Sequence, residues 1–176
     1  MTAPTQSSRP LGTRLARSIS IGAFVAMLLG VIGLIATRHL FGRALPAILV
    51  QALAVLLFAW ARLTLGRRSF HLAADPTPGG LVTTGPYRFL RHPIYAAVCL
   101  FAWAGALDDA SPSALLLSFV VSVGAIVRSG CEEHLIVERY PAYREYAAST
   151  GGMIPRLPAF LGFRRRPLQG LPTRKR

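Results

Sequence analysis

The sequence is poor in acidic residues and in cysteine. It has 7 Asp and Glu residues against 20 Lys and Arg, so its formal net charge is +13. The two cysteines, Cys99 and Cys131, are too few for a disulfide framework and have no metal-ligand spacing, so we expect both to be small buried apolar side chains. The four histidines are widely separated. We therefore predict no metal site.

The sequence motifs of the common soluble enzymes are also missing. There is no GxGxxG between a strand and a helix, which argues against the nucleotide-binding loop of soluble dehydrogenases and methyltransferases. No P-loop, HExxH, CxxC or GxSxG occurs. A basic chain can bind nucleic acid, but here the arginines flank apolar blocks and no Arg-rich helix carries interleaved aromatic residues. We therefore expect no nucleic-acid partner.

The sequence does contain long apolar runs with basic flanks. Hydrophobic residues make up 52% of the chain and charged residues 15%. Residues 18–37 and 44–61 are long enough to cross a hydrocarbon core. Residues 94–107 and 112–127 are shorter and are joined by DDASP, whose serine and proline are typical of a helix start. We predict an all-α, multi-pass transmembrane protein with about four apolar segments, the last two forming a helical hairpin.

The distribution of charge predicts how this protein lies in the membrane. With four crossings, one side receives 18 of the 20 basic residues, all except Arg38 and Arg43. The positive-inside rule makes that side cytoplasmic. The polar stretch after Arg128 has a helical pattern that Pro141 divides into two short helices. The predicted organisation is a disordered basic N-terminus at 1–17, a membrane domain at 18–158 with its catalytic core at about 79–158, and a polybasic tail at 159–176.

The first of two polar clusters is GLVTTGPYRFLRHPIY, residues 80–95. Gly85 and Pro86 favour a turn, and Pro93 keeps His92 out of a regular helix, so the backbone here is expected to be irregular. Irregular backbone at membrane depth is tolerated where it lines a cavity, and it offers N–H and C=O groups to a polar ligand. The alternative is that the basic residues are interfacial side chains and the second proline only begins a helix.

The second polar cluster is RSGCEEHL, residues 128–135. Arg128 and Glu132 are four residues apart and share one face of a helix. Two adjacent acids, Glu132 and Glu133, are costly beside an apolar segment unless cations match them. Because the hairpin brings both clusters to one membrane face, we predict a polar site between them. The alternative for the second cluster alone is a simple ion pair on one helix.

Together the clusters resemble the isoprenylcysteine carboxyl methyltransferase family, which is related to the membrane phospholipid methyltransferases. The similarity covers roughly residues 79–158. The family motif G-x-Y-x-x-x-R-H-P-x-Y is matched by Gly85, Tyr87, Arg91, His92, Pro93 and Tyr95. After a hairpin, the element Arg-x-x-x-Glu-Glu is matched by Arg128, Glu132 and Glu133, and a Y-x-x-Y helix with an I-P sequence by Tyr143, Tyr146, Ile154 and Pro155.

The resemblance implies a methyltransferase that uses S-adenosylmethionine, bound on the cytosolic side between the two clusters. It implies a lipid or prenylated acceptor, with membrane lipids as neighbours, and places Arg128 near that acceptor. The residues implied in catalysis are Arg128, Glu132 and His92. The residues implied in cofactor binding are Leu81, Val82, Tyr87, His92, Pro93, Ile94, Tyr95, Glu132 and Glu133.

The acceptor is not determined by these motifs. A carboxylate, as in prenylcysteine, is already a nucleophile, whereas an amine must first lose a proton and no dedicated base is visible. This favours O-methylation of an isoprenylcysteine carboxylate over N-methylation of phosphatidylethanolamine. Two further alternatives are a nicotinamide-dependent membrane reductase of related architecture and a membrane subunit without activity.

Overall fold

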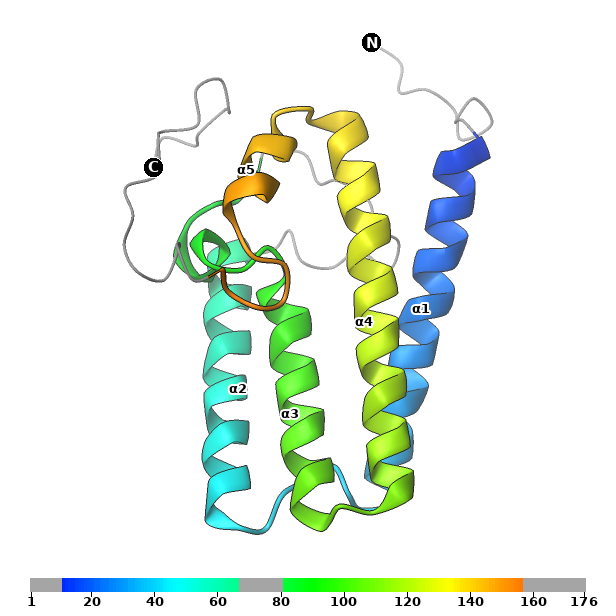
Figure 1. Ribbon diagram of the computed structural model, residues 1–176, viewed down its shortest axis with the longest axis vertical. Helices are drawn as coiled ribbons and strands as arrows, with labels where there is room; N and C mark the ends of the chain where they lie inside the picture. The colour runs from blue at the N-terminus through cyan, green and yellow to red at the C-terminus, as the bar shows by residue number, and fades with distance from the viewer. Residues whose placement is uncertain (1–10, 67–80, 157–176) are drawn as a thin grey trace.

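The computed structural model describes residues 11–66 and 81–156, and within them the chain is helical. Four long helices lie side by side (Figure 1), and each packs on its neighbour in the order α2, α3, α4 and α1. The predicted all-α fold is confirmed. The helices are α1 Leu11–Ala36, α2 Leu45–Leu65, the 3-10 turn η3 Gly85–Arg88, α3 Pro93–Asp109, α4 Pro112–Arg139 and α5 Tyr143–Ser149.

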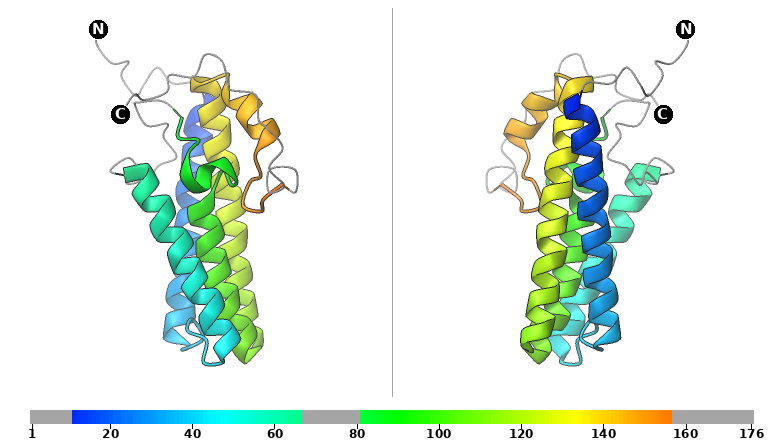
Figure 2. Two further views of the ribbon diagram at one scale, coloured as in Figure 1. Left: turned by 90° about the vertical axis from the view of Figure 1, so that its left-hand side faces the viewer. Right: turned by 90° about the vertical axis from the view of Figure 1, so that its right-hand side faces the viewer.

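Three of these helices, α1, α2 and α4, are long and apolar enough to cross a membrane. The shorter α3 has 17 residues and lies between α2 and α4 (Figures 1 and 2). Large apolar side chains such as Leu29, Leu56 and Phe119 are exposed on the outside of the bundle, as contact with lipid requires. The chain is therefore a multi-pass helical membrane protein.

Small residues allow α1 and α4 to approach closely. A Cβ atom on Gly124 would lie 2.8 Å from the carbonyl oxygen of Ala23, and one on Gly30 would lie 2.7 Å from Cγ2 of Val121. Lipid tails are as apolar as the helices, so close packing of this kind, rather than hydrophobic burial, drives association in a membrane. The buried core consists of Met27, Leu34, Leu40, Ala102, Ala106, Ala114, Val121 and Ala125.

One buried amide ties α2 to its surroundings inside the bundle. The side chain of Gln51 donates hydrogen bonds to the carbonyl oxygens of Leu40, at 2.7 Å, and Phe101, at 3.2 Å. Its Oε1 accepts a bond of 3.1 Å from the backbone N–H of Gly42. A buried polar group is costly unless it is hydrogen-bonded. The Gln51 amide therefore fixes α2 against α3 and against the loop that precedes α2.

The predicted hairpin is confirmed, and its turn begins as the sequence indicated. Ser111 caps α4, because its hydroxyl accepts a 3.1 Å bond from the backbone N–H of Ala114, and Pro112 is the first residue of the helix. Beside it, the carboxylate of Asp108 accepts bonds from the backbone N–H groups of Arg43 and Ala44, where α2 begins. The two loops at this end of the bundle are thereby joined.

Two predicted boundaries are wrong. The expected disordered lead at 1–17 includes residues 11–17, which already belong to α1 and are held there by contacts such as the bond from the Thr13 hydroxyl to Glu138. The polar stretch after Arg128 does not start a separate helix, because α4 continues to Arg139. The break at Pro141 is confirmed. Residues 1–10, the DPTPGG sequence within 67–80 and the tail from 157 onward lie outside the described residues.

The start of α1, the end of α2, η3, the start of α3, the end of α4 and α5 all lie at one end of the bundle (Figure 1). Both polar clusters are therefore at the same end, as the hairpin predicted. The loops that contain Arg38 and Arg43 and that join α3 to α4 lie at the opposite end.

Candidate active site at one end of the bundle

The loop before α3 is shaped by Gly85. Its φ is +57°, a conformation that side chains rarely adopt, and a Cβ atom there would lie 2.6 Å from the hydroxyl of Thr64 in α2. Glycine at this position thus provides both the turn and the close contact with α2. The chain then enters η3, whose Pro86 and Tyr87 are buried.

His92 is outside any helix, as the following proline predicted, and its side chain is buried. It is the N-cap of α3, with φ −126° and ψ 59°, and Pro93 is the first helical residue. Its backbone N–H donates a 3.2 Å bond to the carbonyl of Gly152, and that of Arg91 donates to Gly151 at 2.7 Å. The segment after α5 therefore holds the irregular backbone in place.

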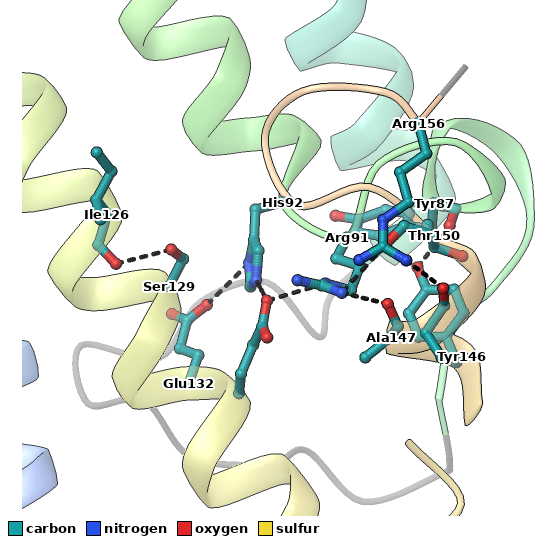
Figure 3. Close-up of polar contacts among 12 residues, drawn as sticks. Tyr87, Arg91, His92, Ile126, Ser129, Glu132, Tyr146, Ala147, Thr150 and Arg156 are labelled. Atoms are coloured by element: carbon teal, nitrogen blue, oxygen red, sulfur yellow. Dashed lines mark hydrogen bonds and ion pairs between the residues drawn. The ribbon is translucent and has the colours of Figure 1, made fainter. Parts of the chain in front are cut away.

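The two polar clusters meet at the ring of His92, which lies against both carboxylates of α4 (Figure 3). Nε2 is 2.7 Å from Oε1 of Glu133, a hydrogen bond in which the ring must be the donor. Nδ1 is 3.8 Å from Oε2 of Glu132, which is within ion-pair range but too long for a hydrogen bond. The predicted proximity of the clusters is confirmed.

Tyr95 links Glu132 to Arg128. Its hydroxyl donates to Oε1 of Glu132 at 2.5 Å and accepts from Nε of Arg128 at 2.6 Å. The guanidinium also lies 3.4 Å from Glu132, the predicted pair on one helix face. Arg128 is only 4% exposed, and α1 supplies further partners, the carbonyl of Ser20 at 3.3 Å and the ring of Phe24 at 4.8 Å. A buried guanidinium needs such partners.

Arg91 joins α4 to α5 and to the residue after it. Its Nε lies 2.9 Å from Oε1 of Glu133, and its Nη1 donates to the carbonyls of Ala147, at 2.6 Å, and Thr150, at 3.1 Å (Figure 3). The hydroxyl of Tyr146 in α5 donates to the carbonyl of Tyr87. These bonds attach α5 and the residues after it to the loop that contains His92.

The other residues predicted to bind the cofactor belong to the chain before α3 and to the start of that helix. Leu81, Val82 and Ile94 are half-buried side chains. Tyr87 is buried, and this burial, with the negative charge of Glu132, raises its pKa to about 12. Burial also raises the pKa of Tyr143 in α5.

Sequence reasoning missed the contribution of α1 and the function of Arg91. Ser20 lies in a run that was interpreted only as a membrane span, and nothing distinguishes its hydroxyl from those of Ser18 and Thr37 in the same run. Arg91 was recognised as part of a motif, but nothing in the sequence shows that it reaches α5. His134 is exposed and lies 3.3 Å from Glu138, away from the site.

The family of the chain follows from comparison with known sequences. Residues 41–143, more than half of the 176 residues, match the family described as phospholipid methyltransferase, and they include both polar clusters. The chain belongs to the phospholipid methyltransferase family. The predicted membership of this group of membrane methyltransferases is confirmed, and α1 lies outside the matched residues.

Two curated relatives of this family member have names that refer to metal resistance. The nickel-cobalt-cadmium resistance protein NccN of Alcaligenes xylosoxydans xylosoxydans is 40% identical over 85 residues, which are 46% of this chain and 38% of the relative. The cobalt-zinc-cadmium resistance protein CzcN of Cupriavidus metallidurans is 34% identical over 85 residues, 47% and 38% of the two chains. This chain thus spans about two fifths of the length of these relatives.

No solved structure matches the chain. Across residues 11–66 and 81–156, no group of three or more His, Cys, Asp and Glu side chains could hold a metal ion. What the site does bring together is two carboxylates, two guanidinium groups and an imidazole. This arrangement can bind a ligand that carries both charges and hydroxyl groups.

Proposed function

We propose that this member of the phospholipid methyltransferase family transfers the methyl group of S-adenosylmethionine to a lipid-like acceptor at the cytosolic face of the membrane. The observation that carries the proposal is the contact of His92 with both Glu132 and Glu133, beside the buried Arg128. An apolar bundle has no structural need for such a costly polar cluster. The cluster therefore argues for a polar ligand at this end of the protein.

The side chains at the site fit the groups of S-adenosylmethionine. That molecule carries an ammonium, a sulfonium, a carboxylate and ribose hydroxyls. Glu132 and Glu133 have side chains 22% and 26% exposed, and the bonds from Arg91 and His92 to Glu133 both fall on Oε1, which leaves Oε2 to accept from a ligand. Because Nε2 of His92 donates this bond, an Nδ1 that carries no proton would accept a bond from the ligand's ammonium or from a ribose hydroxyl. The half-buried Leu81, Val82 and Ile94 would contact the base.

The chemistry requires alignment more than acid or base catalysis. When bound, the cofactor supplies a methyl group that a nucleophile can displace from its sulfonium. Transfer in line depends on positioning and on exclusion of water, both of which a site at the end of a packed bundle can provide. Tyr95 holds Arg128 and Glu132 together, so it would fix the acceptor side relative to the cofactor side.

Arg128 favours an acceptor with an anionic group. We propose a carboxylate of the isoprenylcysteine type first, because its oxygen attacks directly. The new C–O bond forms as the C–S bond breaks, sulfur keeps the electron pair, and no proton has to be removed. A buried guanidinium beside the attacking carboxylate would orient it.

N-methylation of a phospholipid such as phosphatidylethanolamine is the second candidate. The family description favours it. In this case the phosphate would bind Arg128 and the amine would have to lose a proton before attack. The names of the two relatives suggest a cellular function in metal resistance. Methylation of either kind of lipid is compatible with such a function.

The orientation is proposed from charge. Of the eleven basic residues that the structure describes, nine lie towards the end of the bundle that holds the site, and Arg38 and Arg43 lie in the loop between α1 and α2 at the opposite end. By the positive-inside rule the site faces the cytoplasm, where S-adenosylmethionine is made.

The first experiment measures binding of S-adenosylmethionine to the full chain in lipid nanodiscs. We expect the wild type to bind, and Glu132→Gln and His92→Ala each to weaken binding by more than about tenfold. Glu138→Gln makes the same change on the exposed part of α4 and should bind normally. Circular dichroism checks that each variant is folded. Normal binding by both site variants would overturn the site assignment.

The second experiment identifies the acceptor. Labelled methyl transfer is measured to N-acetyl-S-farnesylcysteine and, separately, to phosphatidylethanolamine. Label in the first supports O-methylation, and label in the second alone supports the second candidate. Arg128→Ala should raise the KM for the acceptor more than it weakens cofactor binding, so an unchanged KM would contradict the function proposed for this residue.

A further inference from the structure

Arg128 is a buried cation at membrane depth. It follows Pro112 by 16 residues of the single helix α4, a rise of about 24 Å from the turn at the opposite end of the bundle. Only 4% of the residue is exposed. A charge at this depth is costly unless other groups match it. The groups around this guanidinium therefore decide what it can bind.

The helix α1 is fixed against α4 on both sides of Arg128. The two helices lie side by side along their length (Figure 2). One turn before the arginine, a Cβ atom on Gly124 would lie 2.8 Å from the carbonyl oxygen of Ala23, so the close approach requires glycine. Further along α4, Glu138 accepts a 3.3 Å bond from the hydroxyl of Thr13. These two contacts set the register of α1 against the guanidinium.

Two residues of α1 contact the guanidinium. Ser20 and Phe24 are four residues apart, so they share one face of the helix. Nη1 of Arg128 lies 3.3 Å from the carbonyl oxygen of Ser20 and 3.4 Å from its hydroxyl. Cζ of Arg128 lies 4.8 Å from the centroid of the Phe24 ring, a distance typical of a cation–π pair. The ring is half-buried and also packs against the bundle core.

These partners hold the cation without neutralising it. A carbonyl group and an aromatic ring carry no net charge, whereas a carboxylate in place of the ring would cancel part of the positive charge. The N–H donors of a guanidinium all lie in its plane, so a ring over its face does not compete with an anion for them. The attraction between cation and ring is strongest where the pair is removed from water, as this buried guanidinium is.

We propose that Phe24 is a positioning residue of the active site, whose ring holds Arg128 in the orientation that binds the anionic group of the methyl acceptor. The inference rests on the proposed function and deepens it by assigning a residue of α1 to that site. The family match begins at residue 41, so α1 lies outside it, and the motifs of the two polar clusters do not include Phe24. The ring acts on the acceptor through Arg128.

Fluorination of the ring separates this function from packing. Each fluorine weakens the negative face of the ring and changes its size little. Phe24 is replaced, in the full chain in nanodiscs, by phenylalanines that carry one, two and three fluorines. We expect kcat/KM for N-acetyl-S-farnesylcysteine, or for phosphatidylethanolamine if that is the acceptor, to fall by about twofold with each fluorine. The fall should lie in the KM for the acceptor, and S-adenosylmethionine binding should stay within about twofold of wild type.

Natural substitutions and a second position provide the controls. Phe24→Leu removes the ring and should lower kcat/KM for the acceptor by about tenfold, whereas Phe24→Tyr keeps the aromatic face and should lose clearly less. In the Arg128→Ala background Phe24→Leu should have no further effect, because the two residues act as one unit. The fluorinated series at Phe58, an exposed residue of α2, should resemble wild type. Thermal unfolding checks that each variant is folded.

The mobility of Arg128 provides a readout that needs no acceptor. Nitrogen NMR of labelled arginine follows the exchange of the Nε–H proton with water, and the signal of Arg128 is assigned by its loss in Arg128→Lys. We expect this exchange to become at least about fivefold faster in Phe24→Leu and to stay close to the wild-type rate in Phe24→Tyr.

A flat fluorinated series at Phe24 would overturn the inference, and so would an Arg128 signal that Phe24→Leu leaves unchanged; the proposed function stands in both cases if the wild type methylates a lipid. An equal loss of S-adenosylmethionine binding and of acceptor use would also overturn the inference, because the ring would then support the whole site. If the wild type transfers no methyl group to any lipid, the proposed function fails, and the inference about the acceptor fails with it.

Discussion

Replacing Arg91 by lysine should loosen α5 and the residues after it while keeping the positive charge. The guanidinium bonds Glu133 on α4 and the carbonyls of Ala147 and Thr150 together. A lysine ammonium is a single point of charge on a flexible stem and cannot reproduce this planar fork. We expect it to keep the pairing with Glu133 and to lose the bonds to Ala147 of α5 and to Thr150, which follows that helix.

The size of the effect follows from the number of bonds lost. A hydrogen bond from a charged group contributes about 1.5–3 kcal/mol, and context lowers the sum. For two lost bonds we expect the free energy of local opening of residues 143–151 to fall by about 2–4 kcal/mol. Because about 1.4 kcal/mol is a factor of ten, amide exchange in this segment should become roughly 30 to 1,000 times faster.

Hydrogen exchange followed by mass spectrometry of the protein in nanodiscs measures this opening. The control is Arg88→Lys, since Arg88 is exposed and its guanidinium lies over the ring of Phe89 at 4.9 Å. Peptides from the centre of α4 should exchange as in the wild type in both variants. Equal protection of residues 143–151 in wild type and Arg91→Lys would refute the anchoring function.

Two further predictions concern the loop before α3. Gly85→Ala should lower the free energy of unfolding by about 2–3 kcal/mol, because residue 85 has a positive φ and the new Cβ atom would clash with the hydroxyl of Thr64. The control is Gly130→Ala, whose Cβ atom meets nothing within 4 Å. A melting temperature of Gly85→Ala like that of the wild type would contradict this prediction. The pKa of Tyr87 is raised to about 12, so the folded state favours the neutral phenol and this stabilisation is complete below pH 10. This stabilisation should be lost as the pH rises from about 10 to 12. Across that window the free energy of unfolding of the wild type should fall by about 2–3 kcal/mol relative to that of Tyr87→Phe. Parallel curves of unfolding free energy against pH for the two proteins would disprove the prediction.

The membrane architecture could be predicted because its signals are local. Apolar runs of sufficient length identify spans, and a serine and proline at 111 and 112 mark the start of a helix. The meeting of the two polar clusters followed from the tight hairpin, since a short turn places both outer ends of a helix pair at one end. Irregular backbone at His92 followed from the proline after it.

The remaining features depend on contacts between distant parts of the chain. The polar end of α4 stays helical because Arg91, His92 and Tyr95 match its two carboxylates, and these partners come from other elements. The early start of α1 is coupled to its contact with α4, 125 residues away in sequence. Ser20 as a partner of Arg128 could not be predicted, because no local pattern indicates which residue of a span faces a cation.

The unbroken course of α4 sets the height of the carboxylates within the bilayer. Pro112 begins the helix beside the polar turn at one end, and Glu132 follows 20 residues later in a single α-helix, a rise of about 30 Å, close to the thickness of a hydrocarbon core. Because α4 is continuous, the distance between its start and the carboxylates is fixed. A thicker bilayer would draw the acidic pair towards the acyl chains and a thinner one would expose it to water, so membrane composition alone can tune the hydration of this pair.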